Sequence, residues 1–334
     1  MTSIWVIILP AVLFSLTVGF NQEERKKAWI AYGIFSVFYA LRGEVGTDWQ
    51  AYIYYYSNIN DPTVVARSGF ESGYVLLCRL FSALGLSYWV MLFCISIFIT
   101  YLFYKATEAQ TQNTGIALLI ALFYFFYPSL EAVRQTIALA IFYYSLKHID
   151  DKPIAYFLLN FVAVMFHRTA VIAFMFYFFR KYSWTKVTSV VVVLIFPLLK
   201  PLLNWILSFS PAVLAKFQWY TANTGGMSHL LSVKVLECVA LAVLFHLLPD
   251  KKSSEKLTTD MLDMGMWIQV LLPIIMTDSY RFGYYTDLGI ILACCQIYDR
   301  LEERKHRRYY LLLLIGYIVA RFLRIIIANP QLFV

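Results

Sequence analysis

The sequence predicts an all-α polytopic membrane protein. Of its 334 residues, 60% are hydrophobic and 14% are charged, whereas a soluble domain is about 45–50% apolar and about 25% charged. The apolar residues gather in repeated runs, which are separated by short charged loops. Because about 17–25 apolar residues span a bilayer as a helix, the chain is expected to cross the membrane many times.

The apolar runs predict roughly 11–13 transmembrane helices, some short or broken, around an outward-facing cavity. Residues 74–86 are expected to form a half-helix or an amphipathic segment. Residues 1–334 have no evident internal repeat and no long linker, so they are interpreted as a single integral membrane domain. The expected spans are Ser3–Gly19, Ala28–Leu41, Tyr88–Tyr104, Gly115–Tyr127, Ser129–Lys147, Pro153–Phe166, Thr169–Phe179, Val187–Phe209, Leu231–Leu248, Met261–Met276, Tyr284–Tyr298 and Tyr309–Ala328.

Lysine and arginine in short loops indicate the cytoplasmic side. The loops "NQEERKK", "KHIDDK", "RKYSWTK", "DKKSSEK" and "DRLEERKHRR" share one side if residues 153–179 cross twice and turn at 167–168. The opposite side collects "RGEVGTDW", "ESGY", "SLEAVRQ", "FHRTA" and "TDSYRFGYY", and there arginine outnumbers lysine. A guanidinium grips phosphate or carboxylate at two points. The outward cavity is therefore expected to bind an anion, most naturally a phosphate or a pyrophosphate.

Residues 42–73 predict an outward loop with an interfacial helix. Thr47 and Gln50 of "TDWQ" fit a capping box. A helix over Asp48–Tyr56 would place one acid and three tyrosines roughly on one face: Asp48, Tyr52, Tyr55 and Tyr56. Two interpretations remain open: a helix that merely lies at the headgroups, or an acid aimed into a cavity with aromatic surfaces beside it.

Glu131 and Arg134 lie three residues apart at the expected outer start of a helix. A local ion pair is the simplest interpretation and contributes a few tenths of a kcal/mol. It explains Glu131 better than Arg134, because a charge inside a span costs about 2.5–3.5 kcal/mol on insertion scales. Arg134 is therefore a candidate for binding the anion.

His167 and Arg168 interrupt a mostly apolar stretch. A lone histidine in a membrane is often a hydrogen-bonded interior residue, but a neighbouring arginine at a helix break favours a functional interpretation. Histidine titrates near a pH of about 6.5. It could accept the proton of a sugar hydroxyl, and nearby arginines would keep it neutral.

Two further places combine arginine with a helix end or a span. Asp278 and Arg281 occupy a break between helices, and Tyr284 lies on the same helix face as Arg281. The alternative interpretation of this segment is a capped loop with a local ion pair.

In the last span, Arg321 lies about 18 Å from the start of the span at about 1.5 Å per residue, past the middle of a hydrocarbon core about 30 Å thick. Snorkelling to the headgroups suits Arg324 better.

Several classes of function have no support in the sequence. The chain lacks GxxxxGK[ST], GxGxxG, HExxH, CxxC and GxSxG, the motifs of ATP hydrolysis, hydride transfer, zinc chemistry and serine hydrolysis. Its five cysteines lie in apolar runs without metal-ligand spacing and are expected to be buried hydrophobes. The net charge of +8 is attributed to membrane topology and not to nucleic-acid binding. We expect no metal and no cofactor.

The outward motifs resemble, in their order, the EpsG/Wzy class of bacterial polysaccharide polymerases. They are "RGEVGTDWQAYIYYY", "ESGY", "EAVRQTIALAIFYYSL", "FHRTA" and "DSYRFGYY". The resemblance extends from about Arg42 to Tyr285. Its specific parts are the elements R-x-x-x-G-T-D-x-x-x-Y and H-R-[ST]-A.

The resemblance implies a GT-C-type membrane glycosyltransferase at the outer face of the bacterial inner membrane, facing the periplasm or the exterior. Such an enzyme moves a growing glycan from undecaprenyl pyrophosphate to the sugar end of an incoming lipid-linked repeat unit. Donor and acceptor are then both undecaprenyl-pyrophosphate-linked oligosaccharides. The resemblance further implies a metal-independent, inverting mechanism, contact with membrane lipid and a chain-length regulator protein as partner.

The resemblance also implies roles for the candidate residues. The arginines expected to hold the departing pyrophosphate are Arg42, Arg134, Arg168, Arg281 and Arg321. Asp48 and His167 compete as the catalytic base, with Glu71 as a third candidate. Sugar contacts are expected from Trp49, Tyr52, Tyr55, Glu131, Asp278 and Tyr284.

Other functions would use similar residues. A flippase for lipid-linked oligosaccharides also needs arginines for pyrophosphate, but on a path that opens to both faces and without a base. A ligase or acyltransferase acting on surface polymers could carry the same outward histidine and arginine. A non-catalytic assembly subunit is disfavoured by the number of charges within the expected spans.

Overall fold

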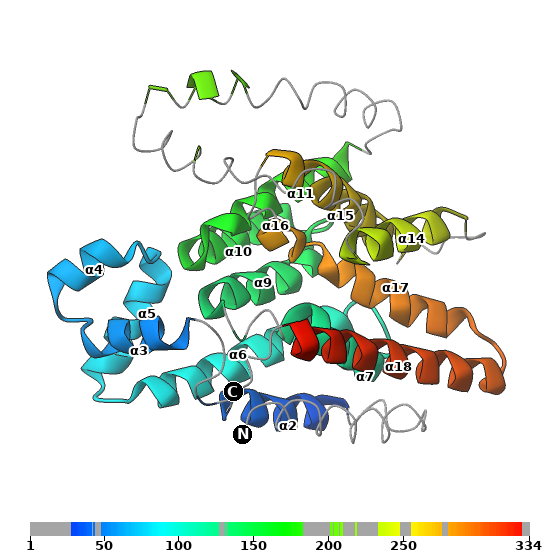
Figure 1. Ribbon diagram of the computed structural model, residues 1–334, viewed down its shortest axis with the longest axis horizontal. Helices are drawn as coiled ribbons and strands as arrows, with labels where there is room; N and C mark the ends of the chain where they lie inside the picture. Colours follow the sequence, from blue (N-terminus) through cyan, green and yellow to red (C-terminus); the bar gives the residue numbers. More distant parts are fainter. Residues whose placement is uncertain are drawn as a thin grey trace. The chain divides into compact units, whose positions relative to one another are not determined.

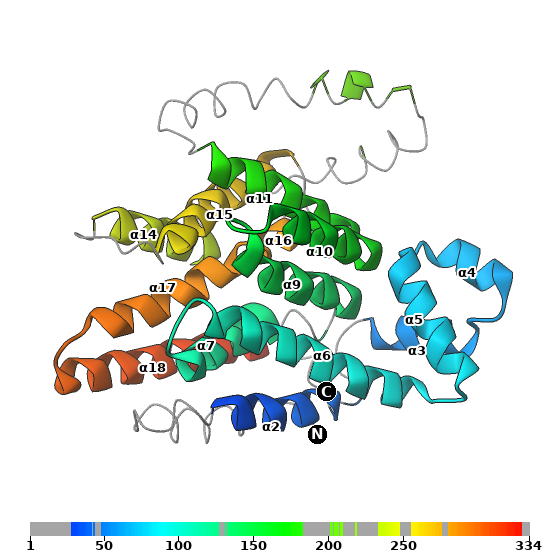
Figure 2. The ribbon, with the colours of Figure 1, turned by 180° about the vertical axis from the view of Figure 1, so that it is seen from behind.

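The computed structural model describes residues 28–41, 43, 48–126, 130, 132–182, 201–202, 204–206, 208–209, 218, 233–247, 255–275 and 280–328. Across these residues the regular structure is helical, as the sequence predicts (Figures 1 and 2). Contacts divide the chain into two compact units, which are considered separately. Unit 1 is Met1–Val171 with Cys294–Val334, and unit 2 is Ile172–Ala293.

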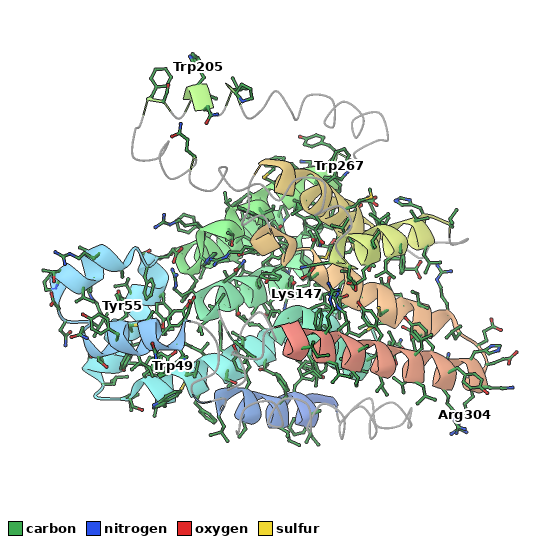
Figure 3. The ribbon with its side chains drawn as sticks, in the orientation of Figure 1. Trp49, Tyr55, Lys147, Trp205, Trp267 and Arg304 are labelled. Atoms are coloured by element: carbon green, nitrogen blue, oxygen red, sulfur yellow. The ribbon has the colours of Figure 1, made fainter. Side chains whose placement is uncertain are left out.

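Unit 1 is built around α9, whose side chains are almost all buried. α9 packs against α6 and α10, and α6 packs in turn against α2. The short helices α3, α4 and α5 gather beside the N-terminal end of α6 (Figures 1 and 3). The elements are α2 (Ala28–Ala40), α3 (Trp49–Ser57), α4 (Pro62–Ser68), α5 (Ser72–Ala83), α6 (Tyr88–Glu108), α7 (Thr114–Ala121), the π-helix η2 (Leu122–Phe126), α9 (Val133–Ser145), the 3-10 turn η3 (Leu146–His148), α10 (Pro153–Phe166), the 3-10 turn η4 (Arg168–Val171), the end of α17 (Asp287–Arg300) and α18 (Arg304–Ala328).

Unit 2 contains α11 (Ile172–Lys181), α14 (Val233–Leu247), α15 (Glu255–Ile275), α16 (Tyr280–Gly283) and the start of α17. α15 packs against both α11 and α14. Side-chain pairs join these helices: the N···O distances are 2.5 Å for Arg180–Asp260, 2.8 Å for His246–Asp263 and 2.7 Å for Lys234–Asp287.

Among the described residues, α6 is the one helix long and apolar enough to cross a membrane by itself. Shorter apolar helices cover Ser72–Ala83, Thr114–Phe125 and Pro153–Phe166. α6 buries one side in unit 1 and leaves large apolar side chains such as Trp89 and Phe93 exposed. Such exposed apolar faces fit a membrane protein, while the predicted number of spans stays a prediction.

Most predicted segments coincide with helices to within a few residues, and Pro153–Phe166 is the whole of α10. The predicted spans Ser3–Gly19 and, for the most part, Val187–Phe209 lie outside the described residues. The expected half-helix at residues 74–86 is α5, which has 12 residues.

The predicted break at His167–Arg168 is confirmed. Pro153 occupies the first turn of α10, where its missing N–H costs no hydrogen bond. The helix ends at Phe166, because His167 adopts an extended backbone with φ −157° and ψ 127°. The turn η4 then leads into α11. The break places two polar side chains between two apolar helices.

The predicted capping box is wrong. α3 begins at Trp49 with Asp48 in the N-cap position, and no side-chain hydrogen bond caps it. Thr47 lies outside the described residues. The prediction that the tyrosines share one face of the helix agrees with the structure, because Tyr52, Tyr55 and Tyr56 are all buried.

Gly73 allows α5 to approach α10 closely. A Cβ at this position would lie 2.8 Å from the backbone oxygen of Met165, and backbone cannot move aside as a flexible side chain can. We expect Gly73→Ala to lower the free energy of unfolding by about 1–3 kcal/mol, measured by thermal unfolding in detergent. The control is Gly33→Ala in α2, where a Cβ would meet nothing within 4 Å and alanine should be neutral or stabilising. Equal stability of the two variants would refute the close approach.

Candidate functional site

Glu71 and Arg134 form an ion pair that joins α5 to α9. Glu71 lies in the N-cap position of α5, and Nη1 of Arg134 donates to its Oε2. The two side chains are 10% and 18% exposed. The local partner that the sequence suggested for Arg134, Glu131, lies outside the described residues. Arg134 is thus held by an acid 63 residues away in sequence.

Arg168 approaches the same carboxylate from η4. Its backbone N–H donates to Oε1 of Glu71 at 3.3 Å, and its Nε lies 3.7 Å from that oxygen. Nη2 also donates to the carbonyl of Gly69 at 3.1 Å. Gly69 ends α4 at φ +63°, a conformation that favours glycine. We call Glu71, Arg134 and Arg168 the Glu71 cluster.

An aromatic wall supports the Glu71 cluster. The guanidinium carbon of Arg134 lies 4.1 Å from the ring centroid of Phe70. Phe70 in turn contacts Tyr55, Tyr52 and Tyr74, with ring centroids 4.4, 5.7 and 5.6 Å away. A guanidinium over an aromatic face is attracted by about 0.5–2 kcal/mol. The wall therefore fixes the plane of Arg134 as well as its position.

Tyr52 and Asp48 connect α3 to this group. The side chain of Arg134 is hydrogen-bonded to Tyr52, whose pKa is raised by burial, while the Arg134 charge opposes that rise. The charge of Asp48 also raises the pKa of Tyr52, so the carboxylate lies near enough to act on this phenol. Asp48 is exposed. The electrostatic effect of Asp48 on Tyr52 links the start of α3 to the tyrosine that is hydrogen-bonded to Arg134.

His167 belongs to a second hydrogen-bonded group, which we call the imidazole network: His167, Thr169 and Gln135. His167 is 9% exposed. Its Nδ1 lies 2.6 Å from Oγ1 of Thr169 and also accepts from the Thr169 backbone N–H at 3.4 Å. Nε2 of Gln135 donates to the same hydroxyl oxygen at 3.4 Å. Gln135 follows Arg134 on α9, so the network adjoins the Glu71 cluster.

The remaining predicted residues are placed elsewhere or not described. The guanidinium of Arg321 lies over the ring of Phe123 in η2, 4.4 Å from its centroid. Arg281 and Tyr284 belong to unit 2, where Nζ of Lys234 lies 4.6 Å from the Tyr284 centroid. Trp49 begins α3 and is partly exposed. Three predicted residues lie outside the described residues: Arg42, Glu131 and Asp278.

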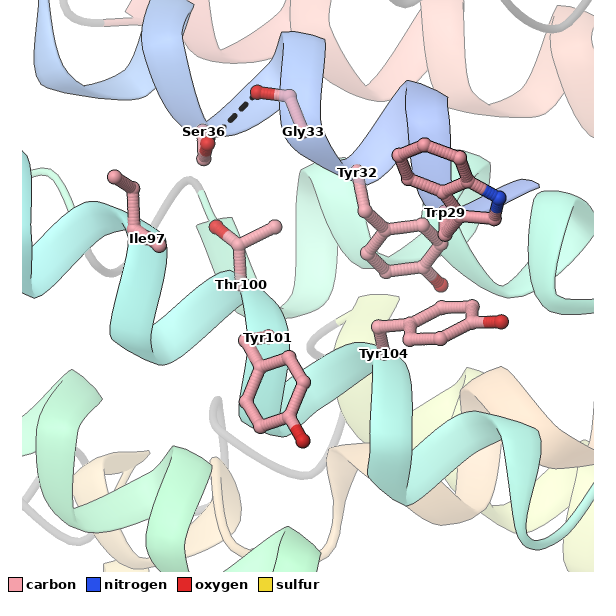
Figure 4. A pocket seen from close by; sticks show the side chains of 8 residues that line it. All are labelled: Trp29, Tyr32, Gly33, Ser36, Ile97, Thr100, Tyr101 and Tyr104. Carbon is pink, nitrogen blue, oxygen red and sulfur yellow. Dashed lines mark hydrogen bonds between the residues drawn. The ribbon is translucent and has the colours of Figure 1, made fainter. Parts of the chain in front are cut away.

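A groove of about 280 Å³ lies between α2 and α6. Aromatic side chains line it, including Trp29, Tyr32 and Tyr101 (Figure 4). Thr100 faces it, and among the described residues its buried hydroxyl has no hydrogen-bond partner. None of the residues proposed from the sequence lines this groove, so it is not the predicted anion-binding cavity.

A comparison with models of protein families shows to which family the chain belongs. The model of the EpsG family matches residues 28–334. The chain belongs to the EpsG family. EpsG is a family of Wzy-like polymerases, and its members are membrane-associated. No curated protein and no solved structure matches the chain. At a coarse level, EpsG membership implies a glycosyltransferase-like polymerase in polysaccharide biosynthesis.

Three residues of this candidate site were not singled out from the sequence: Phe70, Gln135 and Thr169. Each lies directly beside a residue that was singled out, or two positions from it, within "GFESGY", "EAVRQ" and "FHRTA". Their neighbours Glu71, Arg134 and Arg168 stand out in an apolar sequence because they are charged. An aromatic ring, an amide and a hydroxyl do not stand out in this way. Only the approach of α5, α9 and η4 shows that Phe70 contacts Arg134 and that Gln135 and Thr169 form hydrogen bonds beside His167.

Proposed function

We propose that the protein is a polysaccharide polymerase. It transfers a growing glycan from undecaprenyl pyrophosphate to the sugar end of a lipid-linked repeat unit, at the outer face of the bacterial inner membrane. The observation that carries this proposal is the Glu71 cluster, in which guanidinium groups from α9 and η4 share one carboxylate. Family membership supports the polymerase role.

The cluster has the sign of charge that attracts a diphosphate. One carboxylate neutralises one of two guanidinium charges, so a single positive charge remains for a ligand. Arg168 is 66% exposed and can reach that ligand, while Arg134, at 18% exposure, supplies a fixed fork. As the bond to sugar breaks, the diphosphate gains negative charge, and preorganised donors stabilise it. The anion-binding roles predicted from the sequence for Arg42, Arg281 and Arg321 stay predictions.

The same contacts favour a positioning role for Glu71. Its Oε2 accepts from Arg134, and its Oε1 accepts from the Arg168 backbone. Both carboxylate oxygens are therefore already engaged by donors of the protein, an arrangement that suits Glu71 to orienting the two arginines. Asp48 and His167 are therefore the stronger candidates for the base. Proton transfer to such a base leaves the acceptor oxygen free to attack the sugar from the face opposite the diphosphate, with inversion.

Sugar binding is proposed mainly for Trp49, which is partly exposed at the start of α3. Tyr52 and Tyr55 are 3% and 2% exposed, with their rings packed against Phe70 and Tyr74. In this conformation they support the site from behind. A sugar-stacking role for these two tyrosines stays a prediction, as do the roles of Glu131, Asp278 and Tyr284.

The proposal is tested with purified protein and one synthetic lipid-linked repeat unit. We expect a ladder of longer glycans and free undecaprenyl pyrophosphate, without ATP and equally with or without EDTA. The ladder is resolved by electrophoresis and mass spectrometry. A single unchanged band from a folded preparation would contradict the polymerase role. ATP-independent movement of the unit across vesicle membranes without elongation would instead support a flippase.

A further inference from the structure

Helix α5 has two unlike faces. Its residues Tyr74 and Cys78 are buried. Three leucines that follow one another at intervals of four residues are instead 64%, 54% and 64% exposed: Leu76, Leu80 and, at the C-cap, Leu84. Side chains four residues apart lie above one another on one side of a helix. We call these three side chains the leucine face.

The series of exposed apolar side chains continues from α5 into α6. The chain turns at Gly85, whose φ of +67° favours glycine, and the Leu86 N–H donates to the carbonyl of Phe81 at 3.0 Å. This hydrogen bond is typical of a Schellman motif, which fixes the turn. Directly after the turn, Leu86, Trp89 and Phe93 are exposed as well. The leucine face therefore adjoins the exposed apolar side of α6.

Helix α6 indicates which medium covers this surface. Among the residues that the structure describes, α6 is the one helix long and apolar enough to cross a membrane by itself. Exposed apolar side chains on such a helix, here Trp89 and Phe93, face the hydrocarbon of the bilayer. Because only a tight turn separates the leucine face from them, the same medium reaches both.

The composition and the length of α5 favour a helix that lies at the membrane surface. Protein interfaces concentrate their binding energy in tryptophan, tyrosine and arginine, and leucine is under-represented among those residues. Acyl chains, by contrast, require only apolar surface. With 12 residues, α5 is about 18 Å long at about 1.5 Å per residue, which is too short for a hydrocarbon core of about 30 Å. The helix can lie in the membrane surface but cannot cross the membrane.

We propose that α5 lies in the outer surface of the membrane, with the leucine face among the acyl chains of the outer leaflet. Arg79 is exposed beside Leu80 and extends its guanidinium to the lipid phosphates, as long basic side chains do at the edge of the hydrocarbon. An amphipathic helix of this kind sinks about 5–10 Å into the boundary between headgroups and acyl chains. The assignment to the outer leaflet rests on the proposed function.

This position determines the depth of the Glu71 cluster. Glu71 lies in the N-cap position of α5, about 7.5 Å along the helix axis from Leu76. With the leucine face at the headgroup boundary, the Glu71 carboxylate and the arginines that share it lie at the level of the headgroups. The diphosphate of a lipid-linked substrate lies at the same level, because its hydrocarbon tail stays in the bilayer. The leucine face thus holds the cluster at the depth at which the diphosphate arrives.

Electron paramagnetic resonance of spin labels tests the proposal without turnover. Cys94 on α6 is exposed and the other four cysteines are buried, so Cys94 is the site that a label reaches in the full-length protein, and Cys94→Ser removes it. In that background, Leu76→Cys, Leu80→Cys and Leu84→Cys each place a label on the leucine face. The proteins are reconstituted in vesicles of phosphatidylethanolamine and phosphatidylglycerol.

Collisions of the label with oxygen and with a water-soluble nickel chelate report its surroundings. We expect the labels on the leucine face to resemble the label on Cys94, with frequent oxygen collisions and few nickel collisions. Asn60→Cys, in the exposed link between α3 and α4, provides the reference for water. Nickel accessibility like that of Asn60→Cys would overturn the proposal. Low accessibility to both reagents would also overturn it, because a protein surface would then cover the leucine face.

The depth of the cluster has a separate readout, which depends on the proposed function. We expect Leu76→Ser combined with Leu80→Ser to raise KM for the lipid-linked unit in vesicles about 10-fold and to change kcat less than about 2-fold, because less apolar surface holds α5 in the membrane. Leu312→Ser combined with Leu313→Ser removes two exposed leucines from α18 and should keep the wild-type KM. An unchanged KM in the α5 variant would overturn the role of the leucine face in depth. Failure of the polymerase role would leave the spin-label result unaffected.

Discussion

Arg134→Lys is expected to leave the protein folded and to reduce turnover by about 100–1,000-fold. Lysine keeps the charge but loses the planar fork. In the structure that fork donates to Glu71 and is hydrogen-bonded to Tyr52, while its plane rests 4.1 Å from the centroid of Phe70. A single ammonium cannot make all of these contacts and also hold two diphosphate oxygens. The measurement is the initial rate of elongation of the synthetic lipid-linked unit.

The control for this substitution is Arg324→Lys. Arg324 is exposed near the end of α18, so the same chemical change is made away from the Glu71 cluster. It should keep wild-type turnover and stability. Wild-type activity in Arg134→Lys would remove Arg134 from the anion site.

Glu71→Gln is expected to impair both stability and activity. The amide removes the negative charge that offsets Arg134 and Arg168, in a place where the carboxylate is 10% exposed. We expect the free energy of unfolding to fall by about 1–3 kcal/mol. Turnover should fall about 100-fold, because misplaced arginines no longer meet the diphosphate in the required geometry. Thermal unfolding in detergent and the elongation assay measure the two effects.

Glu108→Gln provides the matched control. Glu108 pairs with Lys105 at 2.7 Å, but both side chains are well exposed at 44% and 37%. An exposed pair contributes about 0–1 kcal/mol, so this variant should resemble the wild type. The dependence of turnover on pH distinguishes a positioning role of Glu71 from a role as the base. If Glu71 only positions the arginines, turnover of Glu71→Gln still falls at low pH as in the wild type. If Glu71 is the base, this fall at low pH disappears in the variant.

The helices were predictable because long apolar runs have few alternatives in a membrane. The break at His167–Arg168 was also predictable, since two polar residues between apolar helices are costly unless the chain turns. The capping box failed because α3 begins at Trp49, one residue later than the pattern implies, so that Gln50 is the second helical residue and not the third. The residue types of the segment do not show whether the helix begins at residue 48 or at residue 49.

The members of the candidate site could be predicted where they are charged. Arg134, Arg168 and Glu71 were named from the sequence, and the structure joins them. Their pairing was not predictable, because Glu131 is the nearer acid in sequence and only the packing of α5 and η4 against the rest of unit 1 brings Glu71 to Arg134. The direction of the bonds to His167 likewise depends on the backbone of η4, which the residue types do not specify.

The central claim is that the Glu71 cluster holds a diphosphate as it leaves a carbohydrate. Elongation of one lipid-linked repeat unit by purified wild type and Arg134→Lys, side by side, tests it most directly. The account predicts a ladder from the wild type and little beyond the starting unit from folded Arg134→Lys, with release of undecaprenyl pyrophosphate falling in parallel. Equal ladders from the two proteins, or no ladder from a folded wild type, would contradict it.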